Sequence, residues 1–147
     1  MKVFNRRASH DYHLFEKFEA GIALTGPEVK SAKAGHIRLD EAFVRVKDNE
    51  AWLINSHIHP YPFADNRDYE PTRSRKLLLH KNELLKIGQQ VEKKGLTLVP
   101  VSCYTKHQQI KLEIALARGK RKYEKKEAIK RKDLARETEA SLKMVMH

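Results

Sequence analysis

The change in sequence pattern at Ala117 limits how much of this chain can pack into a core. Apolar residues alternate up to Ala117 as they do in a packed sheet, whereas the residues that follow are mostly charged. From Arg118 to Lys132, nine Lys or Arg residues stand against two acids, so this block carries +7 of the chain's net charge of +11. We therefore predict a folded domain over residues 1–117 and a basic tail over residues 118–147 that is disordered when free.

The composition favours an anionic partner. Apolar residues make up 40% of the 147 residues, which suffices for one small core. The pI is about 9.8, and nucleic acid fits better than a membrane because no apolar run approaches the roughly 20 residues that span a bilayer. Cys103 is the single cysteine, so no internal disulfide can form, and the first residues lack the apolar stretch of a secretory signal. We expect a cytoplasmic protein.

Short alternating segments predict an antiparallel β domain. A strand from Asp11 has a bend or bulge at Gly21, and residues 109–117 form the clearest strand, paired with residues 96–104. Pro100 implies an edge position or a bulge in that partner strand. The other expected segments are an extended basic arm over residues 1–10, a hairpin over 42–47 and 51–58, a long loop over 59–74 and a buried segment over 76–79. Five to six short strands best hide their edges by closing into a small barrel.

Two helices are predicted between these strands. Residues 25–35 have Pro27 at the start, Glu28 at the positive end of the helix dipole and Gly35 at the stop. Asn82 can cap a second helix that ends near Gly95 and that could break at Gly88.

The sequence offers no pattern for catalysis. His57 and His59 could share one face of a strand as metal ligands do, but no recognisable spacing supplies a third ligand, so we interpret them as structural or surface histidines. Cys103 lies in an apolar strand and is interpreted as a core thiol. Nucleophile, phosphate-loop and zinc motifs are absent from the sequence. We expect no enzyme activity and no cofactor.

Two basic clusters remain to be explained. The basic residues after Arg118 fit either a solvated helix face or a nucleic-acid contact, and Tyr123 among them favours RNA because an aromatic ring can stack on an unpaired base. Arg73, Arg75 and Lys76 form a second cluster. Two separated basic sites indicate either two partners or one long partner.

Several segments together resemble one family. They are NRRA at residues 5–8, FEAGI at 18–22, GPEVKS at 26–31, PTRSRKLLL at 71–79 and ARGKR at 117–121. In this order they resemble the SmpB family, the bacterial SsrA-binding proteins that work with transfer-messenger RNA (tmRNA) on stalled ribosomes. The resemblance extends over about residues 5–132.

The resemblance implies a closed antiparallel barrel of OB type with two to three short helices. It also implies an adaptor that binds the tRNA-like domain of tmRNA in place of an anticodon arm and delivers it for trans-translation. Elongation factor Tu would take part indirectly, through the aminoacylated tmRNA. The RNA-binding positions of the family then fall on Glu19, Leu78 and His80. Some family members carry Asn at the position of His80. We also assign Asn5 and Lys76 to the RNA-binding residues.

The resemblance also gives the tail a role at the decoding centre and in the empty mRNA channel of the small ribosomal subunit, where it would become helical. The residues that the family pattern assigns to this contact are Gly119, Lys120, Arg121, Tyr123, Glu124, Lys125 and Lys126. The alternative from another class is a general OB-fold module that binds many single-stranded RNAs and needs no ribosome.

Overall fold

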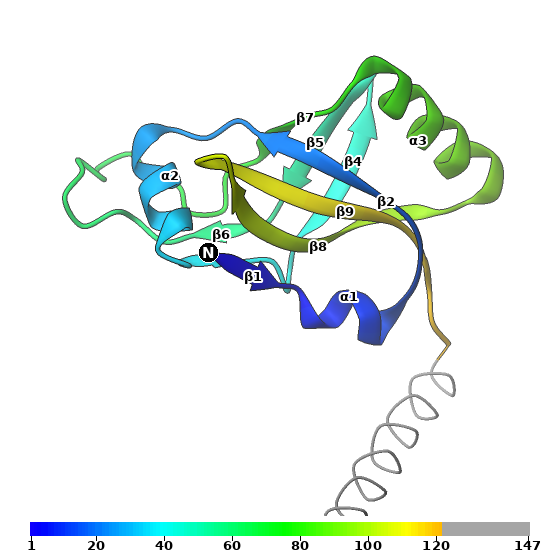
Figure 1. The fold of residues 1–147 in the computed structure, drawn as a ribbon, viewed down its shortest axis with the longest axis horizontal. Coiled ribbons are helices and arrows are strands. Elements are labelled where there is room, and N and C mark those ends of the chain that lie inside the picture. Colours follow the sequence, from blue (N-terminus) through cyan, green and yellow to red (C-terminus); the bar gives the residue numbers. More distant parts are fainter. Residues whose placement is uncertain (122–147) are drawn as a thin grey trace, which may run out of the picture.

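The computed structural model of the protein describes residues 1–121, whose fold is mainly β with three helices (Figure 1). Figure 1 shows α2 and α3 at opposite ends of the molecule, with α1 beside the strands at its lower side. The elements in chain order are β1 Lys2–Phe4, α1 Arg6–Asp11, β2 Tyr12–Ile22, α2 Gly26–Lys33, β3 Ile37–Arg38, β4 Phe43–Lys47, β5 Glu50–Ile54, β6 His57–Ile58, β7 Arg75–Leu78, α3 Lys81–Lys94, β8 Thr97–Lys106 and β9 Gln109–Gly119.

Seven strands form one antiparallel sheet in the order β1-β8-β4-β5-β7-β2-β9, and β9 also pairs with β8. The pairings therefore run from β8 through β4, β5, β7, β2 and β9 back to β8. Strands β3 and β6 form a separate two-stranded ribbon. Side chains from the sheet, the ribbon and α3 make one main core, whose fully buried members include Leu53, Ile58, Ile87, Leu112 and Ile114.

The sequence predicted irregularities at Pro100 and at Gly21. The structure has one at Pro100, but the other lies at a different place in β2. The pairing of β8 with β9 shifts between Pro100 and Ser102, which confirms the bulge expected at Pro100. The irregularity of β2 lies between Leu14 and Lys17, so the bend predicted at Gly21 is wrong. Gly21 stays in register with both of its neighbouring strands, and it serves a close approach described below.

The first ten residues are not a free extended arm, so that prediction is only partly right. Strand β1 pairs with β8, and α1 follows it directly. Asn5 joins the two elements: its backbone N–H donates to the carbonyl of Val101 and its side-chain amide donates to the carbonyl of Pro100, each at 2.8 Å. These bonds hold the N-terminal segment against β8.

Both longer helices begin and end close to the predicted residues, with one correction at the start of α3. In α2, Thr25 and Glu28 make a capping box, and Gly35 follows the helix at φ +83°. In α3 the N-cap residue is His80 and not Asn82, and the helix continues through Gly88 to an αL residue at Gly95. In residues 1–121, no helix is long and apolar enough to cross a membrane.

Candidate nucleic-acid interface

One row of residues lies in register across four strands on the outer face of the sheet. Leu78 of β7 pairs with Gly21 of β2, Gly21 pairs with Lys111 of β9, and Lys111 pairs with Tyr104 of β8. The row faces outward because side chains alternate along a strand, and the residues preceding Leu78, Gly21 and Tyr104 and following Lys111 are buried. We call Leu78, Gly21, Lys111 and Tyr104 the cross-strand row.

Leu78 is held close to the backbone of β2 by the absence of a side chain at Gly21. A Cβ built on Gly21 would lie 3.2 Å from the Cβ of Leu78, tighter than ordinary contact. Leu78 is nevertheless 56% exposed, so its apolar side chain covers little and remains available. Beside it lies a hollow of about 320 Å³ that Gly21, Leu24, Val29, Gln108 and Lys111 help to line. An apolar side chain on the rim of such a hollow offers a contact surface for a ligand.

Glu19 lies on the same face of β2, two residues before Gly21. Its carboxylate accepts a hydrogen bond from the Tyr104 hydroxyl and forms an ion pair with Lys106 at 3.3 Å. The Tyr104 hydrogen bond is the main cause that lowers the pKa of Glu19, and the positive charges of Lys106 and Lys111 lower it further. Glu19 is therefore ionised at neutral pH, and it positions Tyr104 of the cross-strand row and the neighbouring Lys106.

Strand β7 and the start of α3 place the other predicted residues along one line. Lys76 lies two residues before Leu78 and forms an ion pair with Glu50 at 3.3 Å. His80 lies two residues after Leu78, and its backbone N–H donates to the Glu83 carboxylate at 3.2 Å. The His80 side chain is exposed. The structure thus brings Glu19, Lys76, Leu78 and His80 to neighbouring positions.

The structure adds Tyr104, Lys106 and Lys111, which sequence reasoning did not assign to the site. The alternation of β8 and β9 already places them on the outward face. Their position beside Glu19 and Leu78 depends on the register of three strand pairs, and this register cannot be read from the sequence. Asn5 is different, because it is 8% exposed and both of its donors bond to β8.

The second basic cluster predicted from the sequence is wrong as a surface cluster. Arg75 is fully buried, and its Nε donates to the carboxylate of Glu28 at 2.8 Å. Arg73 donates to the same carboxylate. Both guanidinium groups therefore bond to a buried acid. The Arg73 side chain stays 34% exposed, and Lys76 is the member of this cluster that lies beside Leu78 without bonding to Glu28.

The remaining candidates are Cys103, His57 and His59. Cys103 is fully buried, and burial raises the pKa of its thiol to about 12, which confirms a neutral core thiol. The ring of His57 in β6 lies beside that of His59, which follows the strand, and the His59 ring also lies beside that of His36, which precedes β3. Within the described residues no group of three His, Cys, Asp or Glu side chains is arranged to hold a metal ion.

A mainly β fold and a net charge of +11 are combined here with an outward-facing row that holds a cation, an aromatic ring and an apolar side chain. These features are typical of sheet proteins that bind nucleic acid. Comparison with known proteins identifies the family within this class. The model of the SmpB protein family matches residues 2–144. The chain belongs to the SmpB family, which confirms the resemblance drawn from its motifs.

Individual relatives agree over nearly the whole chain. An SsrA-binding protein of Sulfurihydrogenibium sp. (strain YO3AOP1) is 55% identical over 139 residues, covering 95% of this chain and 91% of the relative. An SsrA-binding protein of Lacticaseibacillus casei (strain BL23) is 48% identical and covers 95% of this chain and 88% of the relative. A chain of the solved structure described as "tmRNA-SmpB: a journey to the center of the bacterial ribosome" is 46% identical. It covers 87% of this chain and 94% of its own length, with a TM-score of 0.68.

Proposed function

We propose that this protein is a non-catalytic adaptor that binds the tRNA-like domain of tmRNA and delivers it to stalled ribosomes for trans-translation. The observation that carries the proposal is the similarity to the solved SmpB chain described together with tmRNA and the bacterial ribosome, at 46% identity over 87% of this chain. Work on the ribosome would take place in the cytoplasm, and elongation factor Tu would act through the aminoacylated tmRNA.

The fold that supports this function is a closed barrel of OB type. The strand pairings that return from β9 to β8 support closure, because a ring of pairings leaves few unpaired edges. A closed sheet also keeps the cross-strand row in a fixed geometry. A folded RNA is recognised largely by its shape, so a rigid surface suits it better than a mobile one.

The chemistry of the cross-strand row and of the side chains next to it suits a structured RNA. Leu78 supplies apolar contact to a base or ribose, while Lys106 and Lys111 supply charge for phosphates. Glu19 orders Tyr104 and Lys106 and retains free acceptor capacity for a ribose hydroxyl or a base amino group. We include Lys76 and His80 at the edge of this surface, and assign Asn5 a supporting role through its bonds to β8.

The tail would act after delivery, in the decoding centre and the mRNA channel. Of the predicted tail contacts the structure describes Gly119, Lys120 and Arg121, while Tyr123, Glu124, Lys125 and Lys126 lie outside the described residues. Strand β9 runs to Gly119, and the backbone N–H and the Nζ of Lys120 donate to the carbonyls of Asp11 and Ser9, each at 2.8 Å. The tail therefore leaves the folded domain beside α1.

Removing the tail tests the division of labour between the two parts. A chain that ends at Arg121 retains all of β9, so we expect its affinity for the tRNA-like domain at moderate salt to stay within about threefold of that of the full chain. The full chain should show the steeper salt dependence, because each phosphate neutralised adds roughly 0.7 to 0.9 to the log–log slope. Gel shifts over a range of salt concentrations measure both quantities. A shortened chain without measurable binding would place the specific site in the tail.

The tail's own residues are tested on the ribosome. Lys125→Ala with Lys126→Ala, and Tyr123→Ala separately, should leave tmRNA binding and ribosome recruitment nearly unchanged. Each should reduce transfer of alanine from tmRNA to the stalled nascent chain by about fivefold or more, because one stacked base or two phosphate contacts are worth about 1–3 kcal/mol. Peptide tagging in a reconstituted translation system measures the transfer. Full tagging by both variants would remove these residues from the mechanism.

The alternative, a general single-strand RNA chaperone, makes a different prediction for RNA recovered from cells. Sequencing the RNA bound to the tagged full-length protein should find one structured species in large excess. Many RNAs in similar amounts would support the chaperone instead.

A further inference from the structure

The outer face of the β3–β6 ribbon carries four nitrogen-rich side chains. Ile37 and Ile58 pair with each other and are 2% and 0% exposed, so they face the core. The residues beside them therefore lie on the opposite face of the ribbon. Arg38 is the direct cross-strand partner of His57, and the backbone N–H of His59 bonds to the carbonyl of His36 at 3.0 Å. We call His36, Arg38, His57 and His59 the ribbon cluster.

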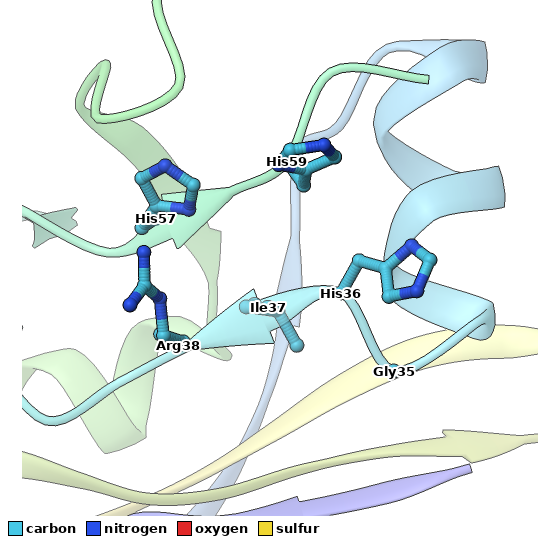
Figure 2. Close-up of a pocket in the computed structure, with 6 residues that line it drawn as sticks. All are labelled: Gly35, His36, Ile37, Arg38, His57 and His59. Carbon is cyan, nitrogen blue, oxygen red and sulfur yellow. The ribbon is translucent and has the colours of Figure 1, made fainter. Parts of the chain in front are cut away.

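The ribbon cluster lines a hollow of about 400 Å³. The ring centroids of His57 and His59 are 6.3 Å apart, and those of His36 and His59 are 6.1 Å apart. Figure 2 shows the guanidinium group of Arg38 directed toward His57, with the His59 ring between His57 and His36. The six residues that line the hollow include no carboxylate. The hollow therefore presents hydrogen-bond donors and positive charge without an internal counter-ion.

The groups around the hollow reinforce this electrostatic character. Burial lowers the pKa of His57, and the positive charges of Arg38, His59 and Arg75 lower it further. Arg75 approaches from β7, and its carboxylate partner Glu28 is shared with Arg73. From α2, Lys30 lies 5.3 Å from the ring of Tyr61. Positive groups that repel one another in an unoccupied hollow are stabilised when an anion enters it.

Exposed aromatic rings follow the ribbon cluster in the chain. Phe63 is 87% exposed and lies edge-on to Tyr61 at a centroid distance of 5.5 Å. A large aromatic side chain in this position covers no core, whereas it can stack on an unpaired base. Cations for a phosphate and an aromatic ring for a base are together the recognition chemistry of single-stranded RNA, and an acidic peptide would use only the first.

We propose that the ribbon cluster binds a phosphate group of single-stranded RNA while Phe63 stacks on a neighbouring base. This site shares no lining residue with the hollow beside Leu78, so it is a second RNA contact on the folded domain. The inference depends on the proposed function only for the class of ligand, and it is tested without tmRNA.

The test uses the full-length protein and a short oligouridylate, with inorganic phosphate as the second probe. Proton–carbon NMR spectra report the imidazole signals of His57 and His59 and the ring signals of Phe63 individually. We expect oligouridylate to shift all three sets. An unchanged set of imidazole signals at saturating oligouridylate would overturn the proposal, because RNA held by the tail alone does not reach them. Imidazole shifts with both probes but an unmoved Phe63 would identify a site for free phosphate and overturn the RNA contact.

Variants give the quantitative test. Arg38→Gln should weaken oligouridylate binding about 5- to 10-fold and lower the log–log salt slope by about 0.7, the value for one phosphate contact on a single strand. Phe63→Ser should weaken binding by at least about 5-fold with an unchanged salt slope. Arg45→Gln is the matched control, since Arg45 is an exposed arginine on β4 outside the ribbon cluster. Equal losses in Arg38→Gln and Arg45→Gln would show bulk charge and overturn the site.

Acidity provides an independent readout. Lowering the pH from about 7.5 to about 6 should strengthen oligouridylate binding several-fold, because a bound phosphate favours the protonated form of His57, whose pKa burial and neighbouring positive charges lower in the free protein. The double variant His57→Gln with His59→Gln should lose most of this gain, and a gain equal to that of the unmodified protein would contradict the proposal. Affinity for the tRNA-like domain is measured in parallel. Its retention when the ribbon contact fails overturns this inference alone, and the reverse result overturns the proposed function alone.

Discussion

Replacing Leu78 by aspartate should lower the affinity for the tRNA-like domain of tmRNA by about 100-fold or more. Leu78 is 56% exposed in the free protein, and covering that surface with RNA is worth roughly 1.5–2 kcal/mol. A carboxylate at this position also meets the phosphate backbone, which adds on the order of 1 kcal/mol or more. Together these terms approach 3 kcal/mol, and 1.4 kcal/mol is a factor of ten. Gel shift or calorimetry with the isolated tRNA-like domain measures the loss.

A matched control separates the surface from the fold. Leu85 of α3 is 50% exposed, so Leu85→Asp makes the same chemical change outside the cross-strand row. Both variants should keep the thermal unfolding midpoint within a few degrees, because neither leucine is buried. Glu19→Lys should also abolish binding, since it removes the acceptor of Tyr104 and Lys106. Leu78→Asp and Leu85→Asp with the same affinity would reject the assignment of the RNA-binding face.

Local sequence patterns predicted local structure well. The alternation of residues 109–117 and the punctuation of residues 25–35 lie within single elements, so β9 and α2 could be placed without knowledge of the fold. The cap of α3 was misplaced because residues other than Asn can occupy an extended N-cap position, and here His80 does so. The bulge of β2 was misplaced because glycine permits irregular backbone but also permits close packing.

Contacts between residues far apart in the chain could not be predicted from the sequence. Arg73 and Arg75 look like surface cations by composition, but both bond to Glu28, an acid 45 and 47 residues earlier in the chain, and Arg75 is fully buried. The same limit applies to the candidate site. Glu19 and Leu78 were assigned to it through family resemblance, while Tyr104 and Lys111 lie beside them only because of the strand register. His36 became a neighbour of His59 only when β3 paired with β6.

Glu28, the buried acid that pairs with Arg73 and Arg75, connects several elements at one end of the folded domain. Glu28 is 1% exposed and lies between α2 and β7. Burial by itself raises the pKa of its carboxyl, but hydrogen bonds from Arg73, the Thr25 backbone and Arg75 outweigh burial and lower it to about 2. Arg75 also donates to the carbonyls of Ser56 and Pro71, each at 3.0 Å. One ion pair thus ties α2, β7 and the long loop together.

Glu28→Gln should therefore destabilise the folded domain by about 3–5 kcal/mol at neutral pH, because the variant leaves the Arg75 charge buried without a counter-ion. The Glu28 contribution exists above the ordinary carboxyl pKa of 4.5 and disappears as the pH falls toward about 2, where the folded protein binds the same proton. The stability difference between the unmodified protein and Glu28→Gln should accordingly be constant above about pH 5.5 and shrink by about 3 kcal/mol on acidification. Urea unfolding at several pH values measures it.

Glu16→Gln is the control for this experiment. Glu16 forms an ion pair with Lys86 at 2.6 Å, but its side chain is 45% exposed, so we expect a loss under about 1 kcal/mol. The comparison separates a buried acid that organises the fold from an ordinary surface pair of similar geometry. Equal destabilisation by the two variants, or a Glu28→Gln difference that persists unchanged to pH 2, would mean that the Glu28 carboxylate is not held ionised by Arg73 and Arg75.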